Sequence, residues 1–336
     1  MFEKVSDIEF EEIFMNIIDL SSKANTYKFA FMRFLLEYCK THNETHVDFF
    51  TISEYFLKYY WIQECKSKLK QSPQSEGNPE VIKIIQKEFQ KAYYPQSFVK
   101  IREKEPEKIK KCIERIRKMC FHDVTWRLQN VKYGKKSEER KIFFDYKIKH
   151  IFRPTRKLVN LEYGIVLNPD AMSFFKRYNT VLNKAVTLEW AKFLEKLNLK
   201  VPQLISKTEG KEIERGNLKK FKDVLEPLFK NCFYCNNILK PGKETHVEHV
   251  IPFDFIREDN IWNFTLACQS CNCKKLGSLP PEKYLNELIK RNKNYRKKIP
   301  LLEKSLLRLG VEFEKIIQDH YWVAKSHGYM ILKDFP

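Results

Sequence analysis

Two Cys-x-x-Cys pairs constrain the fold of this 336-residue chain more than any other feature of its sequence. The first pair is Cys232 with Cys235 and the second is Cys268 with Cys271, with 32 residues between the pairs. Four thiolates in two such pairs suit a tetrahedral Zn²⁺ ion, and chance spacing or a redox pair are the alternatives. Because four sulfur ligands complete the coordination sphere, the predicted zinc is structural and leaves no position for a substrate or a catalytic water.

The other cysteines and the net charge narrow the class of protein. Cys273 is a spare thiol beside the second pair, and four further cysteines lie singly in helical patterns, where buried or free thiols are expected (Cys39, Cys65, Cys112 and Cys120). The net charge is +19 and the pI is near 9.4, which favours a polyanionic partner because Lys and Arg release counterions from phosphates. Residues 101–160 hold 19 Lys and Arg against 8 Asp and Glu, a concentration that a nucleic-acid groove needs.

The sequence predicts neither a membrane span nor an export signal. No stretch approaches the about 20 uninterrupted apolar residues of a spanning helix. Acidic residues occupy the N-terminal segment where a signal peptide has a basic start and an apolar run. We therefore expect a cytoplasmic protein without membrane association.

Apolar periodicity predicts a mainly helical α+β chain. Helical spacing covers about the first 125 residues and begins with a capping box formed by Ser6 and Glu9. Short runs rich in aromatic and branched residues follow between Val131 and Leu167 and are typical of strands. Asn168-Pro169 then predicts the start of another helical region.

The segment between and just beyond the cysteine pairs carries residues suited to phosphodiester chemistry. A strand-like run ends at Pro252, a second (NFTLAC) leads to Cys268, and a short helix can follow. Glu248 supplies a hard oxygen ligand for Mg²⁺, His249 titrates near neutrality, and Asn272 offers a neutral amide oxygen. Phosphodiester hydrolysis needs a base that deprotonates water and a cation that stabilises the developing charge.

These residues resemble the HNH, or ββα-metal, nuclease signature. The shared pattern is Glu248-His249-x-x-Pro252, then Trp262-Asn263, then Cys268-x-x-Cys271-Asn272-x-x-Lys275, and the resemblance as a whole covers about 50 residues. The resemblance implies a general base at His249, catalytic Mg²⁺ ligands at Glu248 and Asn272, and a loop-holding role for Asn263. It also implies phosphate contacts at Lys275, and neighbouring Lys274 is expected to share them. One departure is that the family commonly has Asp where this chain has Glu248.

Neighbouring residues receive plainer interpretations. His246 shares a strand face with Glu248, so it can contact metal or phosphate, although structural packing is an equal alternative. Trp262 is expected in the core, and the connecting-loop acids are expected to face solvent (Asp254, Glu258 and Asp259). Because Glu248 and His249 are adjacent, they can serve one site only if the strand twists or ends beside them.

The predicted domain organisation separates recognition from cleavage. Residues 1–155 are interpreted as a mostly helical, basic DNA-binding region that recognises the target. Residues 156–336 are interpreted as the nuclease region, with a zinc-braced ββα-metal module at about 229–280 followed by helices. Base reading is assigned to residues 101–160, whose basic side chains alternate with Tyr133, Phe143, Phe144 and Tyr146, and the competing location is Lys290–Lys298.

The function predicted from the resemblance is metal-dependent hydrolysis of double-stranded DNA, leaving a 3′-hydroxyl and a 5′-phosphate. A nuclease motif beside a long basic region most resembles a bacterial type II restriction enzyme, including the type IIS arrangement. The alternatives are another phage-defence or mobile-element HNH nuclease and a non-catalytic zinc-braced DNA-binding protein. The expected cofactors are Mg²⁺ and Zn²⁺, and the expected partners are DNA, a second copy during cleavage and a cognate DNA methyltransferase.

Overall fold

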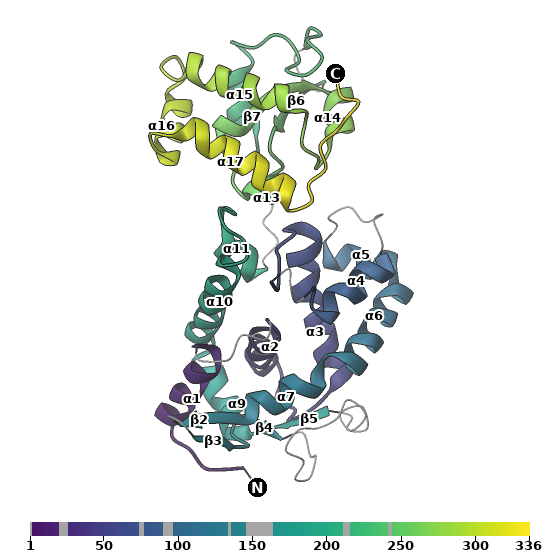
Figure 1. Cartoon of the computed structure of the whole chain (residues 1–336), viewed down its shortest axis with the longest axis vertical. Helices are drawn as coiled ribbons and strands as arrows, with labels where there is room; N and C mark the ends of the chain where they lie inside the picture. The colour runs from purple at the N-terminus through teal and green to yellow at the C-terminus, as the bar shows by residue number, and fades with distance from the viewer. Residues whose placement is uncertain are drawn as a thin grey trace. The chain divides into compact units, whose positions relative to one another are not determined.

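The computed structural model of the chain describes residues 2–19, 26–73, 77–89, 97–133, 136–145, 164–210, 216–240 and 244–336. The chain divides into two compact units, which are drawn together in Figure 1. Unit 1 comprises Met1–Asn198 with Lys207–Gly210, and unit 2 comprises Leu199–Ser206 with Lys211–Pro336.

Unit 1 is mainly helical and carries short antiparallel strands. Its helices are α1 (Asp7–Asp19), α2 (Tyr27–Thr41), α3 (Phe49–Trp61) with a π-helical turn (Ile62–Lys66), α4 (Glu80–Phe89), α5 (Phe98–Lys104), α6 (Pro106–Met119), α7 (Phe121–Gln129), α9 (Pro169–Arg177) and α10 (Asn179–Glu195). Its strands are β1 (His46–Asp48), β2 (Asn130–Tyr133), β3 (Lys136–Glu139), β4 (Phe144–Asp145) and β5 (Gly164–Leu167). They form one sheet in the order β1-β5-β4 and a separate β2-β3 hairpin.

Helix α2 is the centre of unit 1. It contacts α1, α3, α7, α9 and α10, and Figure 1 shows it end-on among its neighbours. Ten of its 15 residues are buried, which is typical of a helix surrounded by other elements. Aromatic side chains fill much of this core, including Phe31, whose ring centroid lies 5.2 Å from that of Phe144.

Local sequence signals explain where several of these helices begin. The Ser6 hydroxyl accepts a hydrogen bond from the Glu9 N–H at 3.3 Å, and the predicted apolar stripe of α1 is buried. The Asn168 side chain caps α9 by accepting from the Asp170 N–H at 3.0 Å, with Pro169 in the first turn. Both predicted helix starts are confirmed.

The division between the two units differs in position from the boundary predicted near residue 155. Helices α9 and α10 pack against α2, so they belong with the N-terminal unit, which continues to Asn198. The strand-like pattern did not reveal this because it changes at Val131, inside unit 1. Residues 146–163, which include Tyr146 and most of the predicted strand runs, lie outside the described residues.

Unit 2 contains the strand–strand–helix arrangement that the sequence predicted. Its elements are α12 (Lys219–Leu225), β6 (Thr245–His249), α13 (Phe253–Ile256), the 3₁₀ turn η4 (Ile261–Asn263), β7 (Phe264–Cys268), α14 (Gln269–Lys275), α15 (Glu282–Tyr295), α16 (Pro300–Leu309) and α17 (Phe313–Ser326). A further short helix, α11 (Leu204–Glu209), spans the division between the units. Within unit 2 the last helix, α17, packs against both α15 and α16 (Figure 1).

The predicted fold class is confirmed: the chain is mainly helical, with small sheets and a four-cysteine module in its C-terminal region. Across the described ranges, every helix is too short or too polar to cross a bilayer.

Candidate functional site

The candidate site is built on the β6–β7 hairpin. In this antiparallel pair Glu248 lies opposite Thr265 and His249 lies opposite Phe264. Successive strand residues face opposite sides, so Glu248 and His249 lie on different faces of the hairpin. Helix α14 lies against the Glu248 face, while Phe221 of α12 packs 4.7 Å from the Phe264 ring on the other. Because β6 ends at His249, this residue stands where the strand gives way to a bend.

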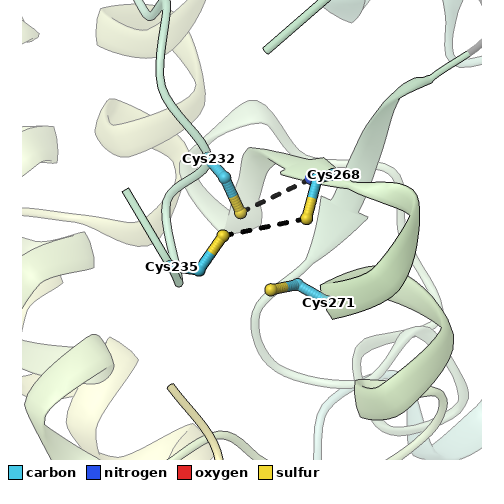
Figure 2. A group of neighbouring side chains, drawn as sticks. All are labelled: Cys232, Cys235, Cys268 and Cys271. Atoms are coloured by element: carbon cyan, nitrogen blue, oxygen red, sulfur yellow. Dashed lines mark hydrogen bonds between the residues drawn. The ribbon is translucent and has the colours of Figure 1, made fainter. Parts of the chain in front are cut away.

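The four cysteines of the two pairs converge beside the far end of this hairpin. Their sulfur atoms all lie within 4.8 Å of one another, and Figure 2 shows the four side chains pointing toward a common centre. The Cys235 and Cys268 sulfurs are 3.8 Å apart. A tetrahedron with Zn–S bonds of about 2.3 Å has edges of about 3.8 Å, so the cluster fits a structural zinc ion.

Backbone donors favour the thiolate form of one of the four cysteines, Cys232, whereas burial raises the pKa of Cys235 and Cys271. Burial alone would raise the pKa of Cys232, but N–H groups of Cys235, Cys268 and Tyr234 outweigh it and hold that pKa below its usual value. The Cys268 N–H donates to the Cys232 sulfur at 3.4 Å. A small apolar core supports the cluster, formed with the two buried ligands by Tyr234, Ala267, Tyr284 and Phe335. Residues near the C-terminal end therefore help to hold the zinc site.

His249 is held in one orientation by its neighbours. Its side chain is 7% exposed, and its ring packs against Phe253 at 5.2 Å and Phe264 at 4.5 Å, nearly edge-on to both. Its Nε2 lies 3.1 Å from Oδ1 of Asp259. Hydrogen bonding to His249 lowers the pKa of Asp259, so this carboxylate is ionised at neutral pH. The prediction that Asp259 faces solvent was wrong, because its carboxylate contacts the candidate base.

Asn263 closes the turn that follows His249. Its amide Nδ2 donates to the Ile251 carbonyl at 2.8 Å, and its Oδ1 accepts from the Ile251 N–H at 2.8 Å. The Val250 N–H also donates to the Asn263 carbonyl at 2.9 Å. Asn263 is fully buried, so these bonds satisfy polar groups that water does not reach. This geometry supports the predicted loop-holding role.

Helix α15 supplies a second support for the turn at Asn263, and the sequence pattern does not reveal it. The buried Arg291 guanidinium donates to the Ile261 and Trp262 carbonyls at 3.3 and 3.2 Å and also to the Phe264 carbonyl. Burial lowers the pKa of Arg291 to about 9. Asn292 adds a bond to the Trp262 carbonyl at 2.9 Å. These two side chains fix the backbone on both sides of Asn263.

Lys275 corrects one sequence-based prediction. It was expected to contact phosphate, but it is fully buried, and its Nζ donates to Glu248 Oε1 at 2.8 Å and to the His249 carbonyl at 2.7 Å. The ammonium therefore links α14 to the end of β6 and holds the Glu248 carboxylate. A lysine at the end of a short helix resembles a surface residue in sequence, and only the tertiary contact distinguishes it.

The remaining candidate residues are placed as follows. Asn272 of α14 is half-buried, and its side chain makes no hydrogen bond to any residue in the described part of the chain. Lys274 is exposed and available to a phosphate. The His246 Nε2 is enclosed and has no hydrogen-bond partner within the ranges described above, on the strand face that also carries Glu248. Trp262 is buried in the core, as predicted.

Asn263→Ala and Asn272→Ala are expected to differ in how much each lowers the free energy of unfolding. The first leaves the buried N–H and carbonyl of Ile251 unpaired, at a cost of about 1–3 kcal/mol for each group. The second removes a half-buried amide without a hydrogen bond in the described structure, so the free energy of unfolding should change by about 0.5 kcal/mol or less. Urea unfolding of both variants tests this, and equal losses of stability would contradict the assigned difference.

Comparison with known proteins divides the chain in the same way as its compact units. A family model described as Domain of unknown function (DUF8808) matches residues 9–209, which is more than half of the chain. The chain belongs to this family. A second model, described as HNH endonuclease, matches residues 232–276. No curated protein and no solved structure matches the chain.

Residues 232–276 are thus an HNH endonuclease domain with a four-cysteine cluster, as the sequence resemblance indicated. This HNH domain contains β6, β7, α14 and all four cysteines. The DUF8808 region ends close to the end of unit 1 at Gly210. Arg291 and Asn292 lie outside both matches, so the HNH domain of this chain is supported by a helix that its family model does not include.

Proposed function

We propose that the chain is a metal-dependent endonuclease that hydrolyses phosphodiester bonds of double-stranded DNA. The observation that carries the proposal is the placement of His249 at the end of β6 in an HNH domain, in a bend closed by Asn263. In this placement the imidazole stands beside the turn that Asn263 closes, at the position that the HNH resemblance gives to the general base. The structural zinc maintains this geometry.

In this proposal His249 is the general base and Asn263 holds the turn on which the base stands. Glu248 and Asn272 would hold a Mg²⁺ ion, since a carboxylate and an amide oxygen are ligands that this hard cation accepts. When bound, such an ion stabilises negative charge on the phosphate and on the leaving oxygen. Lys275 orients the Glu248 carboxylate through its 2.8 Å bond, and Lys274 is the remaining candidate for a phosphate contact.

Unit 1 is the proposed recognition region. The HNH domain offers two short strands and a short helix, which is little surface for reading several base pairs. The DUF8808 region is more than four times as long and carries a concentration of basic residues. This division of labour is typical of type II restriction enzymes, including type IIS. A cognate methyltransferase would then protect the host DNA, and two copies would cut the two strands.

The structure changes which side chains of unit 1 are candidates for DNA contact. Phe143 and Phe144 are buried, so they belong to the core and are removed from the predicted base-reading set. Three basic residues of α6 form ion pairs with acidic residues: Lys108 with Glu105, Arg115 with Glu88 and Arg117 with Glu114. Lys110 and Lys111 are exposed and have no acidic partner in the part of unit 1 that the structure describes.

Neutralising Lys110 and Lys111 with glutamine is expected to weaken DNA binding and to flatten its salt dependence. Each lost phosphate contact lowers the slope of log K against log salt by about 0.9. Binding titrations at several salt concentrations measure this slope. The control is Arg117→Gln with Glu114→Gln, which removes a pair without changing the net charge. An unchanged slope for the lysine variant would remove α6 from the binding surface and favour the Lys290–Lys298 stretch.

Digestion of phage DNA by the full chain with Mg²⁺ tests the proposed class of enzyme. Discrete fragments are the expected result for a restriction enzyme. A smear would support nuclease activity but reject site specificity, and would favour another phage-defence or mobile-element nuclease. Uncut DNA with a gel shift would reject the nuclease and favour the zinc-braced DNA-binding protein.

A further inference from the structure

The contact between His249 and Asp259 singles out a residue that the HNH resemblance does not assign. Asp259 lies in the loop between α13 and η4, ten residues after His249, and its side chain is 22% exposed. Its two carboxylate oxygens have different partners: Oδ1 contacts His249 Nε2 at 3.1 Å, and Oδ2 accepts from the Gly216 N–H at 3.3 Å. The Gly216 N–H therefore holds one carboxylate oxygen, and the other oxygen is directed at the imidazole.

Gly216 is closely fitted to this carboxylate. A Cβ atom at position 216 would lie 2.9 Å from Asp259 Oδ2, a distance at which the carboxylate or the loop must shift. The absence of a side chain thus permits the backbone N–H to approach Asp259. Gly216 lies before the HNH domain, so this contact to Asp259 comes from a residue outside the family match.

The arrangement fixes which ring nitrogen of His249 carries its proton. An ionised carboxylate only accepts hydrogen bonds, so the nitrogen facing it must be protonated. A neutral imidazole with a proton on Nε2 has its lone pair on Nδ1. Within the described residues Nδ1 has no hydrogen-bond partner, and the ring cannot easily turn because Phe253 and Phe264 pack against it.

We propose that Asp259 is a positioning residue that holds His249 as the Nε2–H tautomer and so makes Nδ1 the nitrogen that accepts a proton from water. This inference rests on the proposed nuclease function. In the step itself a water proton passes to Nδ1, the water oxygen forms a bond to phosphorus, and the P–O3′ bond breaks. Its electron pair stays on the 3′ oxygen, which takes a proton from solvent. The Asp259 carboxylate stabilises the imidazolium that forms, and this imidazolium then returns the proton from Nδ1 to solvent.

The decisive variant is Asp259→Asn, which keeps the shape of the side chain. Its amide can donate to Nε2, which favours the Nδ1–H tautomer and removes the lone pair from Nδ1. We expect kcat to fall by about 10²–10⁴ while KM changes little, because the effect acts on the base and not on DNA binding. Glu258→Gln is the matched control, since Glu258 is the adjacent acid and bonds Gln203 and Asn260.

The tautomer is measured directly by nitrogen NMR of histidine-labelled protein. The expected result is an Nε2–H signature for His249 in the wild-type chain and its loss in Asp259→Asn. An Nδ1–H signature in the wild type overturns the proposal whether or not the variant folds. The proposal is also overturned if a folded Asp259→Asn variant has the wild-type kcat while His249→Gln is inactive. Full cleavage by His249→Gln would overturn the assignment of His249 as the base, whereas absence of cleavage by the folded wild-type chain would overturn the proposed nuclease function, which keeps the failures distinguishable.

Discussion

Replacing Cys232 or Cys271 with serine is expected to release zinc and to unfold the HNH domain. The four sulfurs join the loop that begins at Cys232 to the end of β7 and the start of α14, beside a small apolar core. Zinc binding contributes about 10–16 kcal/mol in zinc-finger peptides, which equals or exceeds the about 5–15 kcal/mol that stabilises a typical domain. The DUF8808 region has its own helical core and should stay folded.

Metal analysis and limited proteolysis measure this effect. The wild-type chain should contain one zinc ion per chain that Mg²⁺ does not displace, and each variant should lose it together with the protease resistance of residues 232–276. Cys273→Ser is the control, because this thiol is exposed and lies outside the cluster. A folded, active protein without zinc would show that the cluster has another role.

Loss of the His249 imidazole is expected to reduce DNA cleavage by about 10²–10⁴, the range for removing a general base. His249→Ala removes the ring and leaves a cavity between Phe253 and Phe264, so its folding must be checked. His249→Gln is the better variant for this site. Its amide can keep a hydrogen bond to Asp259, whereas it cannot accept a proton from water at neutral pH.

Single-turnover cleavage rates and DNA affinities of both variants measure the effect. DNA binding should remain near the wild-type value, since the base acts on the chemical step. His246→Gln provides the comparison within the same strand. If that substitution abolishes cleavage while His249→Gln leaves it intact, the base is on the other face of β6 and the assignment of His249 is wrong.

Features that depend on local sequence were predictable. The spacing of the cysteine pairs specified the cluster, since zinc needs four ligands in compact pairs. The capping residues Ser6 and Asn168 predicted where α1 and α9 begin, because each satisfies an N–H that the helix itself cannot. The alternation around Glu248 and the following Pro252 predicted a strand that stops at the candidate site.

Features that depend on distant contacts were not predictable from the same patterns. Asp259 looks like a solvated loop acid until the fold brings it to His249. Lys275 looks exposed until its helix packs on β6. Arg291 belongs to a basic run typical of a DNA-binding surface, yet it is buried against three backbone carbonyls. In each case the fold brings a charged side chain to a partner on another element, and composition does not encode that partner.

The extent of unit 1 was misjudged for a related reason. The boundary was predicted near residue 155, within the run of strand-like pattern between Val131 and Leu167, but a domain boundary is set by which elements share a core. Helices α9 and α10 pack on α2 and β5 pairs with β1, so the described strands between α7 and α9 belong to the same unit.

Cleavage of an end-labelled DNA duplex by the zinc-loaded full chain, with Mg²⁺ added or withheld, tests the central claim most directly. The expected result is cleavage only when Mg²⁺ is present, with products that carry 5′-phosphate and 3′-hydroxyl ends. A duplex that stays intact at every Mg²⁺ concentration, although the folded protein binds it, would contradict the assignment of this chain as a nuclease.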